Sequence, residues 1–336
     1  MAMNERDALS KHFLQTCNWG AARRAFLAGD ASDRSYERLF LNNETAVLMN
    51  APAGKGDDPA DFVRIAKYLL SLGLSAPKVL AEDLTNGFLL LEDLGDDTYA
   101  RLIEADAQLT NTLYGAAIDV LVHIQAQPAP QMLPDLSAGE WAEAACFALD
   151  WYRFSITGER ISTEIFRDTL IELLCLHANG PRVTVLRDFH AENLLWLPSR
   201  AGLAKVGLLD FQLAQMGQPG YDLVSLLQDA RRDVPISAEA AMIRRFAISS
   251  GITDFSASYA TLGAQRALRI LGVFAKLCLT AGKPRYVSLI PRVWGQLQRN
   301  LQNPALGKLE TICTELLPVP TTAALNRIKE QCGSFP

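Results

Sequence analysis

The spacing of apolar residues divides the chain into a strand-rich first part and a long helical second part. Before residue 92, apolar residues alternate with polar ones or form short runs, which is typical of strands. A hairpin with a Gly/Ser tip at 29–35 opens this part, and the predicted strands are 36–41, 45–49, 78–82 and 87–91. Two stretches, 7–19 and 59–72, have the spacing of helices. The pattern therefore predicts a small antiparallel sheet accompanied by helices.

From Thr98 onward, helical spacing dominates. The predicted helices are 108–124, 136–157, 164–177, 223–230, 237–250, 257–280 and 286–301. A proline-rich connector, 127–134, separates the first two, because proline interrupts helical hydrogen bonding. A sheet followed by a helical part predicts an α+β fold.

One break in the helical part contains the chain's most informative residues. Two apolar runs, 194–197 and 206–209, are joined by a polar turn, which predicts a β-hairpin. The hairpin would return Asp210 to the neighbourhood of Asn193 and Asp188. The sequence thus predicts that two carboxylates and one amide oxygen meet at a common point.

This set of groups is the one that phosphoryl transfer from ATP requires. One Asp orients the attacking hydroxyl and accepts its proton, while an Asn and a second Asp supply oxygen ligands for Mg²⁺. The protein-kinase signature is D-x-x-x-x-N followed by D-F-G. Here Asp188 and Asn193 have that spacing, and Asp210-Phe211 follows 210 − 188 = 22 residues after the first Asp. We predict Asp188 as the catalytic residue and Asn193 and Asp210 as metal ligands; for the first spacing alone, a turn capped by its own Asp and Asn is the alternative.

Together with residues 29–36, 90–95 and 221–234, these motifs resemble the aminoglycoside phosphotransferase family, small-molecule kinases that share the protein-kinase fold. Within it, the chain looks most like the bacterial anomeric kinases of N-acetylmuramate and N-acetylglucosamine of cell-wall recycling. The resemblance covers nearly the whole chain. It implies a two-lobed protein-kinase-like fold with a small antiparallel-sheet N-lobe and a mostly helical C-lobe.

The resemblance also implies the organisation and the reaction. Residues 1–92 would form the nucleotide-binding lobe, 93–97 the hinge, and 98–336 the catalytic and acceptor-binding lobe. ATP and Mg²⁺ are the expected cofactors. The expected product is a sugar 1-phosphate, formed by transfer of the γ-phosphoryl group to the anomeric hydroxyl.

Nucleotide-binding residues follow from the same resemblance. The loop at 29–35 would lie over the ATP phosphates and offer backbone N–H groups. In the hinge, the backbone groups of Glu92 and Leu94 would meet the adenine edge. A plain β-turn and an acidic loop that caps the helix after it are the respective alternatives. The predicted nucleotide-binding residues are Ser32, Asp33, Arg34, Ser35, Glu92 and Leu94.

In one respect the chain departs from the kinase pattern. A kinase normally places Lys in the third strand, paired with Glu in the next helix, to hold the phosphates. The predicted strand 45–49 contains no Lys, and the predicted helix 59–72 contains no Glu. Either Arg34, Lys55 or Arg64 supplies the positive charge, or Mg²⁺ and backbone groups hold ATP alone.

Acceptor-binding residues are expected in the helical part. The stretch 136–157 is rich in aromatic residues, whose faces suit a sugar ring; Trp151 is our prediction, with Trp141 and Tyr152 as further candidates. Packing of these rings onto the lobe is the alternative. His190 is predicted to line the site or to support the catalytic loop.

Two arginines and one aspartate complete the prediction. Arg231 and Arg232 are expected at the end of helix 223–230, where they would bind an anionic group such as the lactyl carboxylate of N-acetylmuramate. Favourable electrostatics at a helix C-terminus explains the same pair without a ligand. Asp222 is interpreted as the N-cap of that helix, and by resemblance as structural support of the catalytic loop.

Composition excludes several other classes of protein. The apolar content of 49% and the charged content of 21% are globular values, and a net charge of −5 disfavours nucleic-acid binding. The longest apolar stretch, near 270–281, is too short to span a membrane, and the N-terminus has no signal-peptide pattern. Six scattered cysteines are typical of buried, reduced thiols in the cytoplasm. The expected partner is a small-molecule amino sugar, with no obligatory protein partner.

Three alternatives stay open. The first is a kinase for another small acceptor, such as an aminoglycoside, choline or a hydroxy amino acid; the Arg231–Arg232 pair disfavours a cationic one. The second is a nucleotide-binding module without turnover, which the missing Lys–Glu pair suggests. The third is a helical scaffold that binds no nucleotide, which a thermal shift with Mg-ATP would distinguish.

Overall fold

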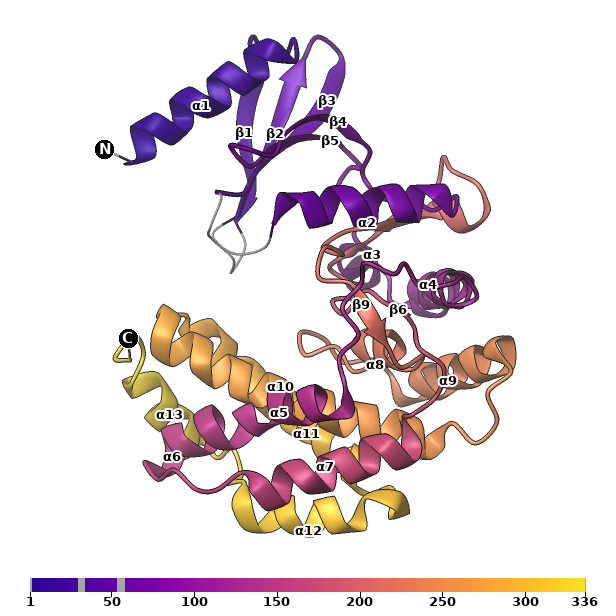
Figure 1. Ribbon diagram of the computed structural model, residues 1–336, viewed down its shortest axis with the longest axis vertical. Coiled ribbons are helices and arrows are strands. Elements are labelled where there is room, and N and C mark those ends of the chain that lie inside the picture. Colours follow the sequence, from indigo (N-terminus) through magenta and orange to yellow (C-terminus); the bar gives the residue numbers. More distant parts are fainter. Residues whose placement is uncertain (1, 30–33, 53–57, 336) are drawn as a thin grey trace. The chain divides into compact units, whose positions relative to one another are not determined.

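The computed structural model describes residues 2–29, 34–52 and 58–335 (Figure 1). The chain divides into two compact units. Unit 1 comprises Met1–Val120 and Leu186–Ala214, and unit 2 comprises Leu121–Val185 and Gln215–Pro336. The predicted catalytic stretch, 186–214, therefore belongs to the same unit as the N-terminal sheet. The lobe boundaries at 92 and 97 stay a prediction.

Unit 1 is built on a five-stranded antiparallel sheet (Figure 1). The strand order is β1-β2-β3-β5-β4, so the hairpin β1–β2 continues into β3, and β5 lies between β3 and β4. The predicted antiparallel sheet is confirmed, and the ends of the four predicted strands differ from the observed ends by at most one residue. The strands are β1 (Arg23–Gly29), β2 (Ser35–Leu41), β3 (Glu44–Asn50), β4 (Val79–Asp83) and β5 (Phe88–Glu92).

Two helices pack in this unit as their sequences predict. Helix α1 (Ala2–Thr16) buries Phe13 and Leu14 against apolar side chains of the sheet, and the Phe13 and Phe88 rings lie 5.8 Å apart. Helix α2 (Pro59–Ser71) begins where the Asp58 side chain accepts the N–H of Ala60, with Pro59 at its first position.

The remaining elements of unit 1 are short. They are α3 (Tyr99–Ala105), the 3-10 turns η1 (Ala107–Leu109) and η3 (Gly202–Lys205), the start of α4 (Thr110–Gln125), and the strands β7 (Leu194–Trp196) and β8 (Val206–Leu208). Strands β7 and β8 pair antiparallel, which confirms the predicted hairpin.

Unit 2 is mainly helical. Its two short strands, β6 (Val183–Val185) and β9 (Gln215–Gly217), pair antiparallel and were not predicted. Its helices and helical turns are α5 (Ala138–Phe147), η2 (Ala148–Arg153), α6 (Phe154–Thr157), α7 (Glu164–His177), α8 (Tyr221–Leu227), α9 (Ile236–Ser250), α10 (Ser256–Ala281), η4 (Pro284–Leu289), α11 (Ile290–Leu301), η5 (Pro304–Leu306), α12 (Gly307–Leu316) and α13 (Thr322–Glu330).

The prediction for this unit was correct for long amphipathic helices and wrong in two places. The single helix expected at 136–157 is three segments, because the six-residue π-helical η2 interrupts it. The helix expected at 286–301 begins as the 3-10 turn η4. Helices α12 and α13 lie beyond the last predicted helix.

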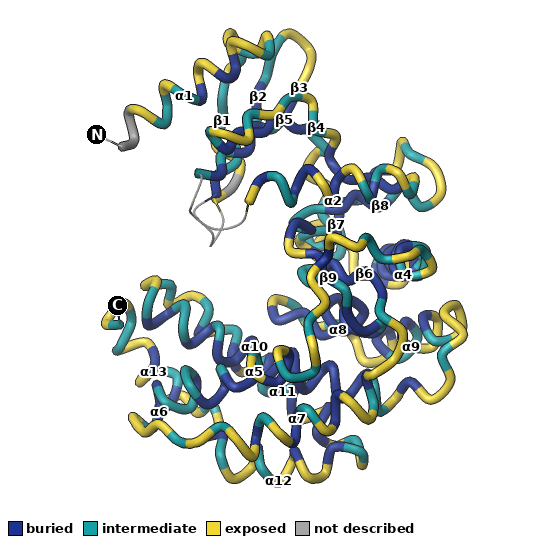
Figure 2. The backbone as a smooth tube through the Cα atoms, in the orientation of Figure 1, coloured by how far each residue is buried: buried dark blue, intermediate teal, exposed yellow. Residues whose placement is uncertain are grey.

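The core of unit 2 forms around α10, which packs against α5, α7, α8, α11 and α13. Most of its residues are buried, and α8 is buried throughout (Figure 2). Gly272 lets α10 approach α5 closely, because a Cβ atom at this position would overlap the backbone carbonyl of Phe147. No helix in the described ranges is long and apolar enough to cross a membrane.

The cysteines are all free. Three of them, Cys146, Cys278 and Cys313, are buried, but Cys175 is exposed, so the expectation that these thiols are buried is only partly correct.

Two helical glycines give a matched test of the α10–α5 contact. Gly272→Ala should lower the free energy of unfolding by about 2 kcal/mol or more, because the new methyl group meets backbone and not a flexible side chain. Gly295→Ala in α11 has no atom within 4 Å of its new Cβ. It should be neutral or stabilise by up to about 1 kcal/mol. Thermal denaturation of both variants measures the difference, and equal melting temperatures would contradict the close packing.

Candidate active site

The β7–β8 hairpin brings the predicted catalytic and metal-binding residues together. Leu194 pairs with Leu208 and Trp196 with Val206. One step further, the N–H of Leu209 donates to the carbonyl of Asn193 at 2.9 Å. Asp210 therefore follows a residue that is hydrogen-bonded directly to Asn193, as the sequence predicted.

The amide of Asn193 is oriented by its hydrogen bonds. Its Nδ2 donates to the backbone carbonyl of Asp188 at 2.9 Å and approaches Asp210 Oδ2 at 3.4 Å. A carbonyl oxygen only accepts, so the amide atom that faces it is the nitrogen. These contacts use the nitrogen, so Asn193 Oδ1 is the atom of the amide that would bind a cation.

The carboxylate of Asp210 is surrounded by donors. Its Oδ1 accepts from Arg34 Nη2 at 3.1 Å and from Gln212 Nε2 at 2.9 Å. The Asp210 side chain is 32% exposed, whereas that of Arg34 is 4% exposed. Gln212 was not predicted; it occupies the position of Gly in D-F-G, and its amide was the signal available in the sequence.

Backbone conformation marks the same two places. Arg187, next to Asp188, has φ 72°, and Asp210 has φ 55°. The left-handed region is tolerated by Asp and is unusual for a residue such as Arg. Strained residues tend to cluster at functional sites, so these angles favour a functional assignment for this loop.

These residues fit a magnesium ion in one specific way. In the part of the chain that the structure describes, no group of three or more His, Cys, Asp or Glu side chains has the geometry of a metal site. Mg²⁺ bound with nucleotide typically takes one or two protein carboxylates and completes its shell with phosphate oxygens and water. Asp210 and Asn193 Oδ1 fit that pattern, so the metal would be held jointly with the nucleotide.

The catalytic loop is anchored at both ends within unit 1. The N–H of Ala100 donates to the carbonyl of Ala191 at 2.9 Å, and the N–H of Trp196 donates to the carbonyl of Asp97 at 2.8 Å. The Phe211 ring is fully buried with its centroid 4.9 Å from that of Phe62 in α2. The position of Asp210 therefore depends on packing against α2 as well as on the hairpin.

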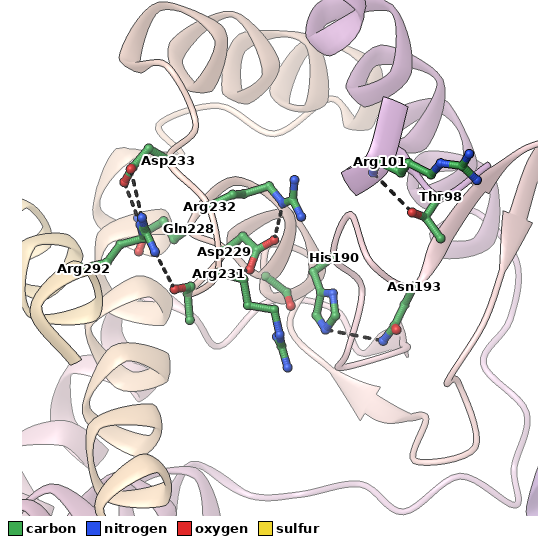
Figure 3. Close-up of polar contacts among 12 residues, drawn as sticks. Thr98, Arg101, His190, Asn193, Gln228, Asp229, Arg231, Arg232, Asp233 and Arg292 are labelled. Atoms are coloured by element: carbon green, nitrogen blue, oxygen red, sulfur yellow. Dashed lines mark hydrogen bonds and ion pairs between the residues drawn. The ribbon is translucent and has the colours of Figure 1, made fainter. Parts of the chain in front are cut away.

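His190 lies inside this loop and is 5% exposed. Its Nε2 is 3.4 Å from Asn193 Nδ2, and its carbonyl accepts the N–H of Asn193 at 2.8 Å (Figure 3). The geometry favours support of the loop over contact with an acceptor, and the substrate-binding assignment stays a prediction.

The structure describes only some of the predicted nucleotide-binding residues. Ser32 and Asp33 lie outside the described residues. Ser35 is the first residue of β2 and pairs with Gly29 and Asn50, and Arg34 precedes it.

The predicted hinge segment, 93–97, contacts an arginine that sequence reasoning missed. Arg38 of β2 contacts Asp93 through Nε at 2.8 Å and Asp96 through Nη1 at 2.8 Å. The hydrogen bond from Arg38 holds the pKa of Asp96 below its usual value. Glu92 ends β5, and its side chain accepts from Arg200 Nη2 at 2.7 Å. Glu92 and half-buried Leu94 thus occupy a fixed segment, and their contact with adenine stays a prediction.

The aromatic candidates in unit 2 differ in burial. Trp141 is 4% exposed and packs on Tyr221 at 4.4 Å, and Tyr152 is fully buried with its hydroxyl donating to the carbonyl of Pro318 at 2.6 Å. For these two rings, packing is the better explanation. Trp151 is half-buried with Lys276 Nζ 5.3 Å from its ring, and it stays a prediction.

The N-cap interpretation of Asp222 is wrong. Helix α8 begins at Tyr221 with Gly220 as its N-cap, and Asp222 is fully buried in the first turn. The helix starts two residues earlier than predicted because the apolar face extends back to Tyr221. Structural support of the site by Asp222 stays a prediction.

Arg231 and Arg232 follow α8 and do not end it, since the helix stops at Leu227. Arg232 Nε donates to the buried carboxylate of Asp229 at 3.0 Å, and the N–H of Arg231 donates to the same group at 2.8 Å (Figure 3). Asp229 was missed in the sequence. The Arg231 side chain is exposed.

The segment that carries these arginines is rigidly supported. Three consecutive carbonyls, those of Gln228, Asp229 and Ala230, accept from side chains of α10 and α11. The donors are Arg266, Gln296 and Arg292. Arg266 is 5% exposed, so its contact with the Gln228 carbonyl is buried. The support fixes where the Arg231 side chain leaves the backbone.

The fold and the sequence define the class. Residues 24–257 match the model of the phosphotransferase enzyme family, and the chain belongs to this family. Choline kinase LicA of Streptococcus pneumoniae has a similar structure, with a TM-score of 0.58 at 14% identity over 90% of this chain and 99% of that one. The ADP-bound aminoglycoside phosphotransferase APH(2″)-Ib gives a TM-score of 0.56 at 13% identity over 87% and 96%. The predicted protein-kinase-like fold is confirmed.

Relatives of known name identify a smaller group within this family. The chain is 38% identical to the N-acetylmuramate/N-acetylglucosamine kinase of Caulobacter vibrioides over 95% of this chain and 98% of the relative. It is 31% identical to the protein of the same name from Pseudomonas aeruginosa over 89% and 90%. The resemblance inferred from the motifs is confirmed.

Arg38→Ala tests whether the segment 93–96 acts as the predicted hinge. Because the segment 93–96 loses its cation, the KM for ATP should rise by about 5- to 10-fold, as expected when a binding segment is no longer held in place. The Asp96 carboxylate contributes stability above its unfolded pKa of about 4 and loses it as pH falls through the lowered folded pKa. The difference in melting temperature between the variant and the wild type should therefore shrink from pH 7 to pH 3.

Arg24→Ala is the matched control, since Arg24 of β1 pairs with Glu37 on the same sheet and does not contact the hinge segment. An equal rise in the KM for ATP in both variants would show that the contact of Arg38 with the segment 93–96 is not the cause.

Proposed function

We propose that this protein is an ATP-dependent, Mg²⁺-requiring kinase that phosphorylates the anomeric hydroxyl of N-acetylmuramate and N-acetylglucosamine. One observation carries the proposal: the hairpin brings Asp188, Asn193 and Asp210 into one hydrogen-bonded constellation. Whole-length similarity to amino-sugar kinases supports the choice of acceptor. The free cysteines suit a reducing compartment, and we place the reaction in the cytoplasm.

The proposed chemistry assigns one role to each of three side chains. ATP with Mg²⁺ supplies the transferable phosphoryl group and neutralises its charge. Asn193 Oδ1 and the Asp210 carboxylate would hold the metal. Asp188 orients the acceptor hydroxyl, and its carboxylate accepts the proton as the new P–O bond forms and the bond to the leaving ADP oxygen breaks. Most of the acceleration comes from positioning and from charge neutralisation.

The direct test follows the acceptor by ³¹P NMR. Protein, Mg-ATP and N-acetylmuramate should give a sugar 1-phosphate signal that grows together with ADP. The methyl glycoside of the same sugar, in which the anomeric hydroxyl is blocked, is the matched control and should give no product. Phosphorylation of the blocked sugar would refute the anomeric assignment, and turnover of choline or an aminoglycoside alone would replace the acceptor.

Asp188→Asn should lower kcat by about 10²- to 10⁴-fold, the usual contribution of a positioned general base. The dissociation constant for Mg-ADP should stay within about threefold, because the isosteric amide keeps the packing of the loop and leaves Asn193 and Asp210 in place. Glu192→Gln removes the exposed neighbouring carboxylate and should change kcat by less than about threefold. Normal turnover in Asp188→Asn would exclude the proposed role.

Substitution of the two arginines after α8 should have different effects. Arg231→Ala should raise the KM for N-acetylmuramate about tenfold and leave that for N-acetylglucosamine nearly unchanged, because only the first sugar carries a lactyl carboxylate. Arg232→Ala removes the partner of buried Asp229 and should instead lower the free energy of unfolding by about 2 kcal/mol. Steady-state kinetics with both sugars, together with thermal denaturation, measures both effects. Equal losses on both sugars in Arg231→Ala would exclude a contact with the carboxylate.

A further inference from the structure

A kinase site needs positive charge from the protein as well as from the metal. Negative charge spreads over the phosphate oxygens in the transition state, and fixed cations stabilise it. Strand β3 has the sequence Glu-Thr-Ala-Val-Leu-Met-Asn and supplies no cation, and its Leu48 and Met49 are buried. A cation that the protein supplies to the phosphates would therefore come from outside β3.

Several nearby cations have other contacts. Arg64 of α2 is exposed and pairs with Asp61 one turn earlier in the same helix. Arg6 of α1 donates to Asn50 Oδ1 from Nε at 2.8 Å and lies over the Phe88 ring at 4.0 Å. These contacts explain Arg64 as part of an ion pair within α2 and Arg6 as part of the packing of α1.

Arg34 is different in position and in burial. It follows the β1–β2 loop directly, its side chain is 4% exposed, and its Nη2 lies 3.1 Å from Asp210 Oδ1. Burial of a guanidinium costs free energy unless anionic groups compensate it. A guanidinium has five N–H donors in a fixed plane, so it is able to contact a carboxylate and phosphate oxygens together.

We propose that Arg34 is the phosphate-binding cation of this kinase, and that it shares Asp210 with the metal. The inference rests on the proposed nucleotide site and deepens it. Without nucleotide, Arg34 and a divalent metal compete for one carboxylate. When nucleotide is bound, the negative charge of its phosphates allows the Arg34 guanidinium and the metal on Asp210 to remain in the site together.

This arrangement predicts that removal of Arg34 changes the affinity for metal and the affinity for nucleotide in opposite directions. Removal of Arg34 relieves a positive charge beside the metal ligand, so a metal alone binds more tightly, while a nucleotide loses a charge-assisted partner and binds more weakly. A residue that only braces the loop would shift both affinities in the same direction, or neither.

The experiment measures two dissociation constants without turnover. Free Mn²⁺ is counted by electron paramagnetic resonance to give the affinity for metal alone, and isothermal titration calorimetry gives the affinity for Mg-ADP. In Arg34→Ala the dissociation constant for Mg-ADP should rise about 10- to 100-fold, the usual range for one charge-assisted contact. The dissociation constant for Mn²⁺ should fall by about two- to fivefold, because like charges near one ligand repel.

Two further variants make the result specific. Arg34→Lys keeps the charge without the fork of donors and should recover part of the Mg-ADP affinity. Arg24→Ala removes another arginine of the same hairpin and should change neither constant. Melting temperatures of all variants confirm that they are folded at the assay temperature.

Three outcomes would overturn the inference. They are a fall in both affinities, no change in Mg-ADP affinity, and loss of Mg-ADP affinity in Lys55→Ala but not in Arg34→Ala. The measurements remain decisive if the proposed acceptor is wrong: wild-type protein that binds Mg-ADP but phosphorylates neither sugar would refute the acceptor and leave the two constants to judge Arg34.

Discussion

The hydrogen bond from Leu209 to Asn193 is the constraint on which the site depends. It extends the β7–β8 register by one step beyond the strands, and so places Asp210 beside the residue that contacts Asp188. A shift of one residue would turn the side chains of one strand to the opposite face of the hairpin. The hairpin is short, so register must be fixed by contacts at its ends as well as by its own hydrogen bonds.

Those contacts come from the N-terminal part of the chain. Phe211 packs on Phe62 of α2. Backbone hydrogen bonds join Ala100 of α3 to Ala191, and Asp97 to Trp196. The predicted nucleotide-binding segments and the catalytic residues therefore share one compact unit, although more than 90 residues separate Glu92 from Asp188 in the sequence. Arg38 adds a further link within this unit, because it joins β2 to the segment that follows β5 by ion pairs.

The sequence predicted what depends on periodicity and on local chemistry. Long amphipathic helices, alternating strands, and the hairpin with its polar turn leave a signal in neighbouring residues. The π-helical turn η2 lies within a stretch of continuous helical spacing, so the apolar pattern did not mark it. The pairing of β6 with β9 is also non-local, and three-residue strands show no period. Side-chain partners such as Arg38 with Asp93, or Arg232 with Asp229, need the fold before they can be recognised.

Asp210 illustrates why a motif alone is an incomplete description of a site. Its carboxylate accepts from Gln212 and from Arg34, and Asn193 Nδ2 approaches it. Any cation that binds this carboxylate must be accommodated among donors already in place, and displacing a charged donor from a partly buried carboxylate costs more than displacing water. Phosphate oxygens supply acceptors for the same donors. If Asp210 binds the metal as proposed, these donors favour metal and nucleotide together over metal alone, because the phosphates would supply the acceptors that the metal displaces.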